Sequence, residues 1–581
     1  MSRLFSSLAT IWRLAWPYFY SDDRWPGRIL LGAVITIELS IVAINVMLNQ
    51  WNNRFYNALQ QRDWNAFVTE LLFFCGLAAA YIVLAVYQLY LNQWLQICWR
   101  RWMTRHYLEH WIAGANHYRM QLLGDAADNP DQRIAEDINL FIDRTVTLTV
   151  GLLSAIVTLG SFITILWTLS ATAPLTLFGH SLVIPGYLVW AALFYAIVGT
   201  LLTHLVGWPL VSLNFRQQRF EADFRFNLVR VRENSEQIAL LAGETAERER
   251  LLDRFGRIVA NWMLIMTRTK RLTFLTAGYA QVSIVFPFVV ISPAYFAGAV
   301  QLGGLMQTAS AFNSVQTALS FFITAYRQLA EWRAVVARLE GFNVAVERAE
   351  DVAKTQPVIE LLPQAEKAPL AIEDLLVRLP QGRPVVTVQN VTVARGETVL
   401  VTGPSGAGKS TLFRAIAGIW PFGAGTIRVP AGAKVMMLPQ RPYFPVGTLA
   451  AAVTYPAETG TFSGERLAEV ISAVGLPELA GRLGEEEHWN RMLSLGEQQR
   501  LGIVRAILLS PDYLFLDEAT ASLDEPAEAA LYRLLAHRLP GATVVSIGHR
   551  STLTAFHRRG LVLVRDGDHY SIHEAALAAA E

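Results

Sequence analysis

Charged residues are scarce in this sequence. Asp, Glu, Lys and Arg make up 17% of its 581 residues, whereas hydrophobic residues make up 53%. A soluble protein usually carries about 25% charged residues, so this composition argues against an ordinary soluble chain. The formal net charge is +1, so the totals also give no case for nucleic-acid binding.

Cysteine is nearly absent as well. The two cysteines, Cys75 and Cys98, lie in or beside apolar stretches and have no metal-ligand spacing. This arrangement excludes a disulfide framework and a Cys-based metal site.

We also expect no cleavable signal peptide in residues 1–25, because they contain charges and many aromatics but no clean apolar core. Leu4, Leu8, Trp12 and Trp16 recur there at helical spacing. The spacing predicts an amphipathic helix on the membrane surface before the first span, with an ordinary core helix as the alternative.

Long apolar runs dominate the first 345 residues. A membrane-spanning helix needs about 20 apolar residues. Six segments meet this length, namely 29–49, 71–91, 148–169, 182–209, 274–295 and 305–326.

Basic residues distribute unevenly between these segments. The loops after spans two and four are rich in Arg, whereas 170–181 and 295–304 contain no Lys or Arg. The positive-inside rule therefore places both long loops and both termini in the cytoplasm.

The composition changes near residue 346. Residues 346–369 are charged, contain two prolines and read as a linker between a membrane domain, 1–345, and a second domain, 370–581. From residue 370 onward, short β-rich runs alternate with helical stretches, which predicts an α/β fold. The strand runs are 385–393, 398–401, 435–438, 513–516 and 543–547.

A phosphate-binding loop follows the predicted strand 398–401 and opens a helix. Its glycines let backbone N–H groups wrap a phosphate, Lys409 reaches the β- and γ-phosphates, and Ser410 binds Mg²⁺. The pattern therefore predicts ATP and Mg²⁺ as cofactors. The predicted nucleotide-binding residues of this loop are Gly403, Ser405, Gly406, Gly408, Lys409, Ser410 and Thr411.

Two acids end the hydrophobic strand 513–516, about a hundred residues later. Asp517 is predicted to hold the metal ion and Glu518 to polarise the attacking water. This is the Walker B position relative to the phosphate loop.

The segment 493–500 resembles the signature motif of ABC proteins, which no other P-loop family carries. The resemblance implies that Ser494, Gly496 and Gln498 complete the ATP site of an opposite subunit. Leu495 departs from the glycine usual at its position, whereas the phosphate-facing Ser494 and Gly496 are kept.

Three further segments fit the same family. Gln440 resembles the Q-loop residue that contacts the metal ion, His549 resembles the switch histidine that senses the γ-phosphate, and 522–524 resembles the D-loop. We therefore predict catalytic roles for Gln440, His549 and Glu518.

An aromatic residue that would stack on adenine is missing. In ABC domains it often lies about 25 residues before the phosphate loop, where this sequence has Arg378 and Leu379. Either side chain is predicted to cover the base, through dispersion or cation–π stacking.

The resemblance extends to a subgroup. Several phrases look like the peroxisomal fatty-acyl ABC subfamily D, and the Trp-rich N-terminus with 330–334 looks closest to bacterial SbmA/BacA-like proteins fused to an ATPase. The subfamily D phrases are 418–421, 442–443, 454–456, 129–137 and 221–244. By this resemblance, 117–123 and 233–241 are coupling loops that contact the ATPase domain.

Polar residues inside the predicted spans indicate a wet cavity. Asn and Gln in such numbers are unusual in lipid, and Glu38 in span one normally requires water or a partner. Glu38 is therefore predicted to attract cations or carry a proton, the alternative being a structural pair with Arg or His. The polar positions are Asn45 in span one, Thr145, Thr147, Thr149, Ser154, Thr158 and Ser161 in span three, and Gln307, Ser310, Asn313, Ser314, Gln316, Thr317 and Ser320 in span six.

Together these features predict a six-helix, all-α, exporter-type (type IV) ABC membrane domain joined to an α/β P-loop ATPase domain. One phosphate loop and one signature per chain imply a homodimer embedded in the lipid bilayer. We expect ATP-driven uptake of peptides or other hydrophilic solutes across a bacterial inner membrane. Export or flipping of a fatty-acyl or lipid cargo is the alternative, and the spans argue against a non-transport ATPase.

Overall fold

The computed structural model describes residues 10–124, 129–172, 175–177, 180–182 and 184–575. It divides into two compact units. The membrane unit comprises Met1–His106 and Asp131–Glu340, and the ATPase unit comprises Tyr107–Pro130 and Gly341–Glu581. The ATPase unit thus includes a segment from the loop after predicted span two, which sequence position alone had assigned to the membrane domain.

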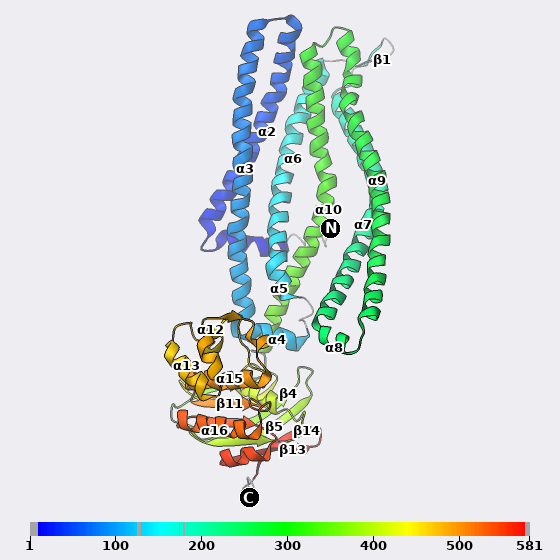
Figure 1. Cartoon of the computed structure of the whole chain (residues 1–581). Coiled ribbons are helices and arrows are strands. Elements are labelled where there is room, and N and C mark those ends of the chain that lie inside the picture. The colour runs from blue at the N-terminus through cyan, green and yellow to red at the C-terminus, as the bar shows by residue number, and fades with distance from the viewer. Residues whose placement is uncertain (1–9, 125–128, 173–174, 178–179, 183, 576–581) are drawn as a thin grey trace. The chain divides into compact units, whose positions relative to one another are not determined.

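Long helices build the membrane unit (Figure 1). They are α2 (Arg24–Gln61), α3 (Trp64–Ile112), α6 (Ile138–Thr172), α7 (Tyr187–Glu233), α9 (Glu244–Phe296) and α10 (Leu302–Val352). Shorter elements are η1 (Trp16–Tyr20), α5 (Pro130–Gln132), η4 (Arg133–Asp137), β1 (Leu175–Leu177), β2 (His180–Leu182) and α8 (Ser235–Leu240).

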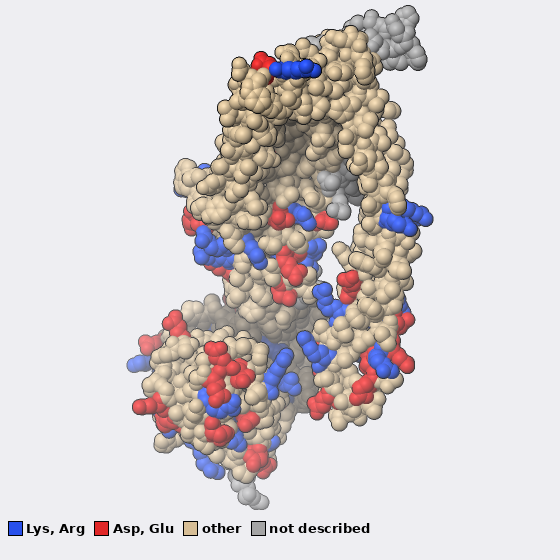
Figure 2. Space-filling view, turned by 45° about the horizontal axis from the view of Figure 1, so that its top comes forward, with Lys and Arg blue, Asp and Glu red and all other residues tan. Residues whose placement is uncertain are grey.

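Five helical segments of the described chain are long and apolar enough to cross a membrane. They contain the first, second, third and fifth predicted spans, and the fourth, 182–209, from residue 187 onward. The sixth predicted span lies in α10, which is 51 residues long but is not among the five. The amides and hydroxyls that α10 carries between residues 307 and 320 lower its hydropathy. Figure 2 shows a broad surface of this unit with few charged side chains, as a lipid-facing surface requires.

The N-terminal segment is helical from residue 10 and presents aromatic side chains outward. Trp12 is 58% exposed and its ring stacks on Trp16, while Tyr18 is buried against Trp99. An exposed aromatic side chain and a buried one on this segment agree with the predicted amphipathic helix. Leu4 and Leu8 of the prediction lie outside the described residues.

Helices α7 and α9 run side by side and α8 joins their ends (Figure 1). Tyr195 and Tyr279 stack with ring centroids 4.4 Å apart, and each hydroxyl donates to the other residue's backbone carbonyl. Helix α9 continues through Pro287 and Pro293.

An amide cluster joins α2 to α10. The Asn49 side chain donates to the Gln307 carbonyl at 2.9 Å and accepts from the Gln307 amide at 3.2 Å. Asn53 donates to the Gln307 side-chain oxygen at 2.6 Å. In lipid such bonds have no competing water, so they fix the two helices relative to each other.

An ionic cluster fixes the beginning of α6. The buried Asp137 carboxylate in η4 accepts from Arg133 four residues earlier, and from Arg338 of α10 at 2.9 and 2.5 Å. Two cations on one buried carboxylate satisfy both of its oxygens, which is the condition for burying a charge.

A ten-stranded sheet forms the ATPase unit, with the order β3-β7-β4-β5-β14-β13-β6-β12-β11-β8. Its strands are β3 (Ile359–Gln364), β4 (Leu370–Arg378), β5 (Pro384–Val393), β6 (Thr398–Thr402), β7 (Gly423–Pro430), β8 (Val435–Leu438), β11 (Tyr513–Asp517), β12 (Thr543–Ile547), β13 (Arg559–Asp566) and β14 (His569–Ala575). The five predicted strand runs are confirmed as β5, β6, β8, β11 and β12. A separate pair consists of β9 (Gly447–Thr448) and β10 (Glu486–Glu487).

Helices cover both faces of this sheet. Strand β11 illustrates this burial on both faces. Its Tyr513 and Phe515 belong to one hydrophobic cluster, and its Leu514 and Leu516 belong to another. A strand buried on both faces reads as a continuous apolar run. The helical elements of the unit are η2 (Ala113–Ala115), α4 (Asn116–Leu123), α11 (Lys409–Ile416), α12 (Leu449–Thr454), α13 (Gly464–Ala473), η5 (Pro477–Arg482), α14 (Trp489–Met492), α15 (Leu495–Leu509), α16 (Glu525–Arg538) and η6 (Ser551–Phe556).

The predicted linker and first coupling loop are both ordered parts of this unit. Residues 346–369 contain the end of α10 and the sheet strand β3, rather than an irregular connection. Leu122 of α4 packs on the hydrophobic cluster of the sheet, and Asn116 donates to Glu350 of α10 at 3.1 Å. The first coupling loop therefore contacts the ATPase core as expected.

The amide cluster yields a stability prediction. Gln307→Leu should lower the free energy of unfolding by about 1 kcal/mol, because it removes a side-chain partner from the buried Asn49 and from the half-buried Asn53. The measurement is thermal unfolding in detergent. Thr308→Val is the matched control, since the Thr308 hydroxyl bonds only its own helix at Gly304, 2.8 Å away. Equal unfolding temperatures for Gln307→Leu and the control would show that the cluster does not hold the helices.

Candidate functional site

The phosphate loop connects β6 to α11 in the way the sequence predicts. Gly403, Gly406 and Gly408 have φ values of 147°, 78° and 89°, a region that side chains with a Cβ rarely adopt. Gly408 directly precedes α11, so the loop delivers the helix N-terminus to the site.

Lys409 is buried within this loop. Its ammonium donates to the carbonyls of Gly403 and Pro404, both at 2.9 Å. Burial lowers the pKa of Lys409, while the neighbouring carboxylates of Glu518 and Asp517 act in the opposite direction. The cation is thus held at the loop in the position from which it can reach a phosphate.

The two predicted metal ligands lie together. Ser410 donates its hydroxyl proton to Asp517 at 2.8 Å. Burial raises the pKa of Asp517, with the hydrogen bond from Ser410 opposing the shift. A hydroxyl and a carboxylate oxygen at this distance are the hard donors that Mg²⁺ takes in nucleotide sites, so the residues fit that ion.

The three predicted catalytic residues lie together, with Gln440 and His549 on either oxygen of the Glu518 carboxylate. Glu518 accepts from the Gln440 amide at 3.1 Å, and His549 Nε2 lies 3.2 Å from its other oxygen. Glu518 has a positive φ of 51°. A left-handed backbone is rare for a residue with a side chain, and functional sites are among the places where it persists.

The signature segment lies apart from the phosphate loop of its own chain. Ser494 caps α15, and Glu497 completes a capping box by accepting from the Ser494 backbone N–H at 2.8 Å. No residue of 493–500 lines the nucleotide pocket described below. The arrangement agrees with a signature that acts on the site of another subunit.

Gln498 is held by backbone carbonyls of its own chain. Its amide donates to the carbonyls of Asn490 at 3.0 Å and Leu493 at 2.8 Å, and the side chain is buried. Gln498 therefore holds the turn before α15. Ser494 is exposed and Gly496 is half-buried, and their contact with a phosphate on a partner chain stays a prediction.

Sequence reasoning missed two residues that organise the site. Arg550 donates to the carbonyls of Leu523 at 2.7 Å and Ala521 at 3.2 Å, which ties the D-loop to the segment of His549. Gln499 donates to the Gln440 carbonyl and accepts from the Ser522 N–H, both at 3.0 Å. Arg550 directly follows His549 and Gln499 lies within the signature segment, and this proximity could have identified both.

A pocket of about 390 Å³ lies at the phosphate loop and Glu518. It contains the expected Leu379 but not Arg378, whose guanidinium turns back to the Gly382 carbonyl at 3.1 Å. The lining residues are Leu379, Arg383, Pro384, Val385, Ser405, Gly406, Ala407, Gly408, Lys409, Ser410, Thr411, Glu518, Asp568 and Tyr570.

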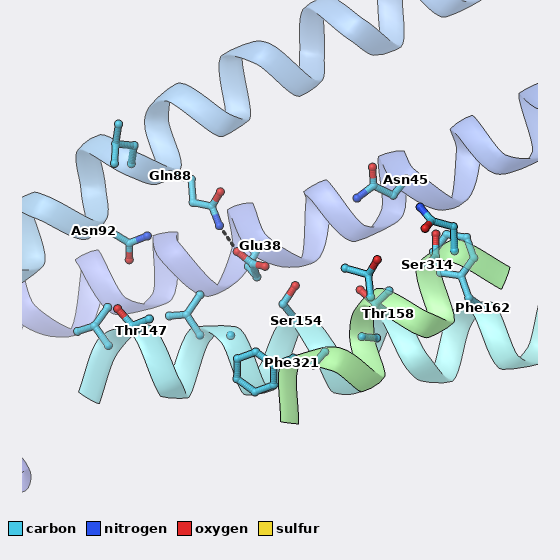
Figure 3. A pocket seen from close by; sticks show the side chains of 18 of the residues that line it. Glu38, Asn45, Gln88, Asn92, Thr147, Ser154, Thr158, Phe162, Ser314 and Phe321 are labelled. Atoms are coloured by element: carbon cyan, nitrogen blue, oxygen red, sulfur yellow. Dashed lines mark hydrogen bonds between the residues drawn. The ribbon is translucent and has the colours of Figure 1, made fainter. Parts of the chain in front are cut away.

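A second site lies in the membrane unit, as a cavity of about 900 Å³ between α2, α3, α6 and α10. Figure 3 shows Gln88 reaching from α3 toward Glu38 on α2, with Ser154 and Ser314 facing the same space. The polar lining residues are Glu38, Asn45, Gln88, Asn92, Gln93, Gln96, Asp143, Thr147, Ser154, Thr158, Ser310, Asn313, Ser314 and Thr317.

Two carboxyl groups lie in this lining. Glu38 is 6% exposed and accepts a hydrogen bond from the Gln88 amide. Asp143 accepts from Gln96 at 3.5 Å, and its carboxylate lies 3.9 Å from the adjacent Arg144. Among the described residues that line the cavity there is no Lys, Arg or His, so Glu38 is not the member of a basic pair.

The predicted polar residues divide between this cavity and structural contacts. Thr145 instead accepts from the Trp332 indole at 2.8 Å, and Gln307 belongs to the amide cluster. The amides of α3 were not predicted, although Gln88, Asn92 and Gln96 recur at four-residue spacing in an apolar span. That periodicity was the signal that could have identified them.

Comparison with known proteins agrees with this geometry. The family model "ABC transporter transmembrane region 2" matches residues 14–296, and the model "ABC transporter" matches residues 386–521. The chain is 36% identical to an uncharacterized ABC transporter ATP-binding protein of Haemophilus influenzae, over 92% of this chain and 88% of the relative.

Two further relatives cover nearly the whole chain. Inner membrane ABC transporter ATP-binding protein YddA of Escherichia coli is 35% identical over 92% of this chain and 93% of the relative. ABC transporter D family member 2, chloroplastic, of Arabidopsis thaliana is 32% identical over 95% and 86%. The fold is similar to a bacterial Atm1-family ABC exporter with ATP bound, with a TM-score of 0.71, 17% identity and 94% of each chain covered.

The convergence on Glu518 yields a kinetic prediction. Glu518→Gln should keep ATP binding but lower steady-state ATPase activity at least a hundredfold, because the amide lacks the charge that orients water. The measurement is phosphate release by the purified protein, alongside an ATP-binding assay. Glu487→Gln, an exposed acid of the same unit, is the control. Near-normal turnover in Glu518→Gln would remove it from the chemistry.

The separation of signature and phosphate loop yields a second prediction. Lys409→Ala chains and Ser494→Arg chains should each be inactive alone. Mixed dimers should regain up to one complete site, because one chain supplies an intact loop and the other an intact signature. ATPase activity of isolated mixed dimers, purified with two different tags, provides the measurement. A wild-type monomer with full ATPase activity would contradict the shared site.

Proposed function

The chain belongs to the ABC transporter family as a subfamily D-like half-transporter, and from this premise we propose that its cargo is a hydrophilic solute bearing positive charge. Peptides are the class that we favour, taken up across the bacterial inner membrane. The half-transporter organisation implies a dimer in the membrane, and we propose that the dimer consists of two identical chains. The ATPase domain implies ATP binding, with Mg²⁺ held by Ser410, Asp517 and Gln440 in our proposal.

The observation that carries the cargo proposal is the composition of the cavity. Glu38 and Asp143 supply carboxyl groups, amides and hydroxyls surround them, and the described lining residues include no base. A carboxylate at mid-membrane costs roughly 3 kcal/mol on insertion scales and more on others, so it requires water or a cation. A solute with positive charge supplies the missing partner of Glu38.

A fatty-acyl or lipid cargo fits this lining less well. An acyl chain in the cavity would displace water from the amides of Gln88, Asn92 and Gln96 without replacing their hydrogen bonds. Each unpaired polar group costs on the order of 1–3 kcal/mol. The balance of these terms supports a hydrophilic cargo over an apolar one.

ATP would act through the closure of two ATPase units. Each ATP lies between one chain's phosphate loop and the partner's Ser494 and Gly496 in this scheme. Hydrolysis at Glu518 lets the pair reopen, and α4 transmits the movement because Leu122 packs on the ATPase core. The second coupling segment, 233–241, ends in Leu240 of α8 and Leu241 after it, which are 79% and 82% exposed. This exposure supports a contact there with the partner chain.

We also propose that the chain lies in the bacterial SbmA/BacA-like branch, on its Trp-rich N-terminus and residues 330–334. The relatives named above carry other names, and none of those names states a cargo. The cavity therefore remains the basis of the cargo proposal.

Substitution of Glu38 tests the proposal. Glu38→Gln should leave basal ATPase activity unchanged and reduce uptake of a cationic peptide about tenfold, because it removes the charge but keeps the shape of the side chain. Uptake of a neutral peptide of equal length should fall much less. The assay uses labelled peptides in cells lacking other peptide importers, with expression checked by blot.

The control is Glu136→Gln, an exposed acid of the membrane unit that does not line the cavity. Unchanged uptake of both peptides in Glu38→Gln would remove Glu38 from the pathway. An equal loss for both peptides would assign it a structural or proton-coupling role instead.

A further inference from the structure

ABC domains often stack adenine on an aromatic residue about 25 residues before the phosphate loop, and this chain has no aromatic side chain there. Leu379 takes that position, and the loop around it is closed by its N–H donating to the Arg383 carbonyl at 2.8 Å. Arg378 is held elsewhere, because its carbonyl accepts from the Trp420 indole at 2.8 Å and its guanidinium reaches Gly382. Neither predicted residue therefore offers a flat ring to a base.

The hairpin β13–β14 lies beside the phosphate loop. In the sheet, β14 is placed between β5 and β13. A Cβ on Gly403 would lie 3.0 Å from Leu563 of β13, and one on Gly408 would lie 2.5 Å from Val385 of β5. The loop thus presses on the strands to either side of β14, so a β14 side chain can reach the nucleotide.

Tyr570 is that side chain. It is paired in register with Val386 of β5, lines the nucleotide pocket, and packs on the same hydrophobic cluster as Leu379 and Val385. We propose that Tyr570 binds the nucleotide base by stacking, in the role that an aromatic residue before the phosphate loop would otherwise fill. Leu379 and Val385 supply the apolar surroundings for the base.

The chemistry of the ring supports this assignment. A half-buried aromatic side chain, fixed by its packing, presents a preorganised surface and loses little entropy on binding. Stacking of a base on an aromatic side chain contributes about a tenfold gain in affinity or more. The phosphate contacts of Lys409 and Ser410 are separate from this contribution, so the two can be measured independently.

The experiment compares Tyr570→Leu with Tyr570→Phe in the purified full-length transporter. Tyr570→Leu keeps an apolar side chain on the core but lacks a ring, and should raise KM for ATP about tenfold with kcat within twofold. Tyr570→Phe should match the wild type. Inhibition by tripolyphosphate, which has no base, should be equal in all three proteins.

Two results would overturn the proposal. One is an unchanged KM for ATP in Tyr570→Leu. The other is an equal loss of ATP and tripolyphosphate affinity, which would show that Tyr570 only supports the phosphate loop. Photolabelling of the wild type with 8-azido-ATP requires no variant, and the label should fall on the peptide of β14 that contains Tyr570. Labelling confined to other peptides would contradict base binding at this residue.

Discussion

The hydrogen bond between Glu38 and Gln88 is the interaction on which the membrane unit depends. A nearly buried carboxyl group without a basic partner among the lining residues can persist in a membrane only if polar groups and water surround it. This requirement explains why α3 carries a row of amides, and why α6 and α10 turn hydroxyls toward the same space. Polar side chains of four helices thus line one cavity with this acid, and the proposed preference for a positively charged solute rests on it.

The nucleotide pocket of the ATPase unit contains the phosphate loop but no residue of the signature segment of the same chain. Glu518, Gln440 and His549 converge within one chain, and so do Ser410 and Asp517. Ser494, by contrast, is committed to capping α15 and lies outside the pocket. The half-transporter organisation implies a dimer, and in the proposed scheme the second chain supplies the signature. Within this unit, Leu122 of α4 packs on the hydrophobic cluster of the sheet.

The ATPase motifs could be predicted because each is a short stretch whose function is set by neighbouring residues. Glu518 and Lys409 were found in this way, and five strands were located by their apolar runs. Side-chain direction could not be predicted, as Gln498 and Arg378 show, since both turn toward backbone carbonyls that the fold brings near. The amides of α3 were hidden within an apolar span, and β3 lay within a charged segment that composition alone read as a linker. Tertiary contacts decide all four cases.

The central claim is that ATP hydrolysis moves a positively charged hydrophilic solute through the cavity of Glu38. Its most direct test is transport by the wild-type protein in proteoliposomes, using peptides of equal length and hydropathy that carry positive, zero or negative net charge. ATP-dependent movement should be fastest for the positive peptide and slowest for the negative one, with the difference shrinking at high salt. Equal rates for the three peptides, or a preference for the negative one, would contradict the account.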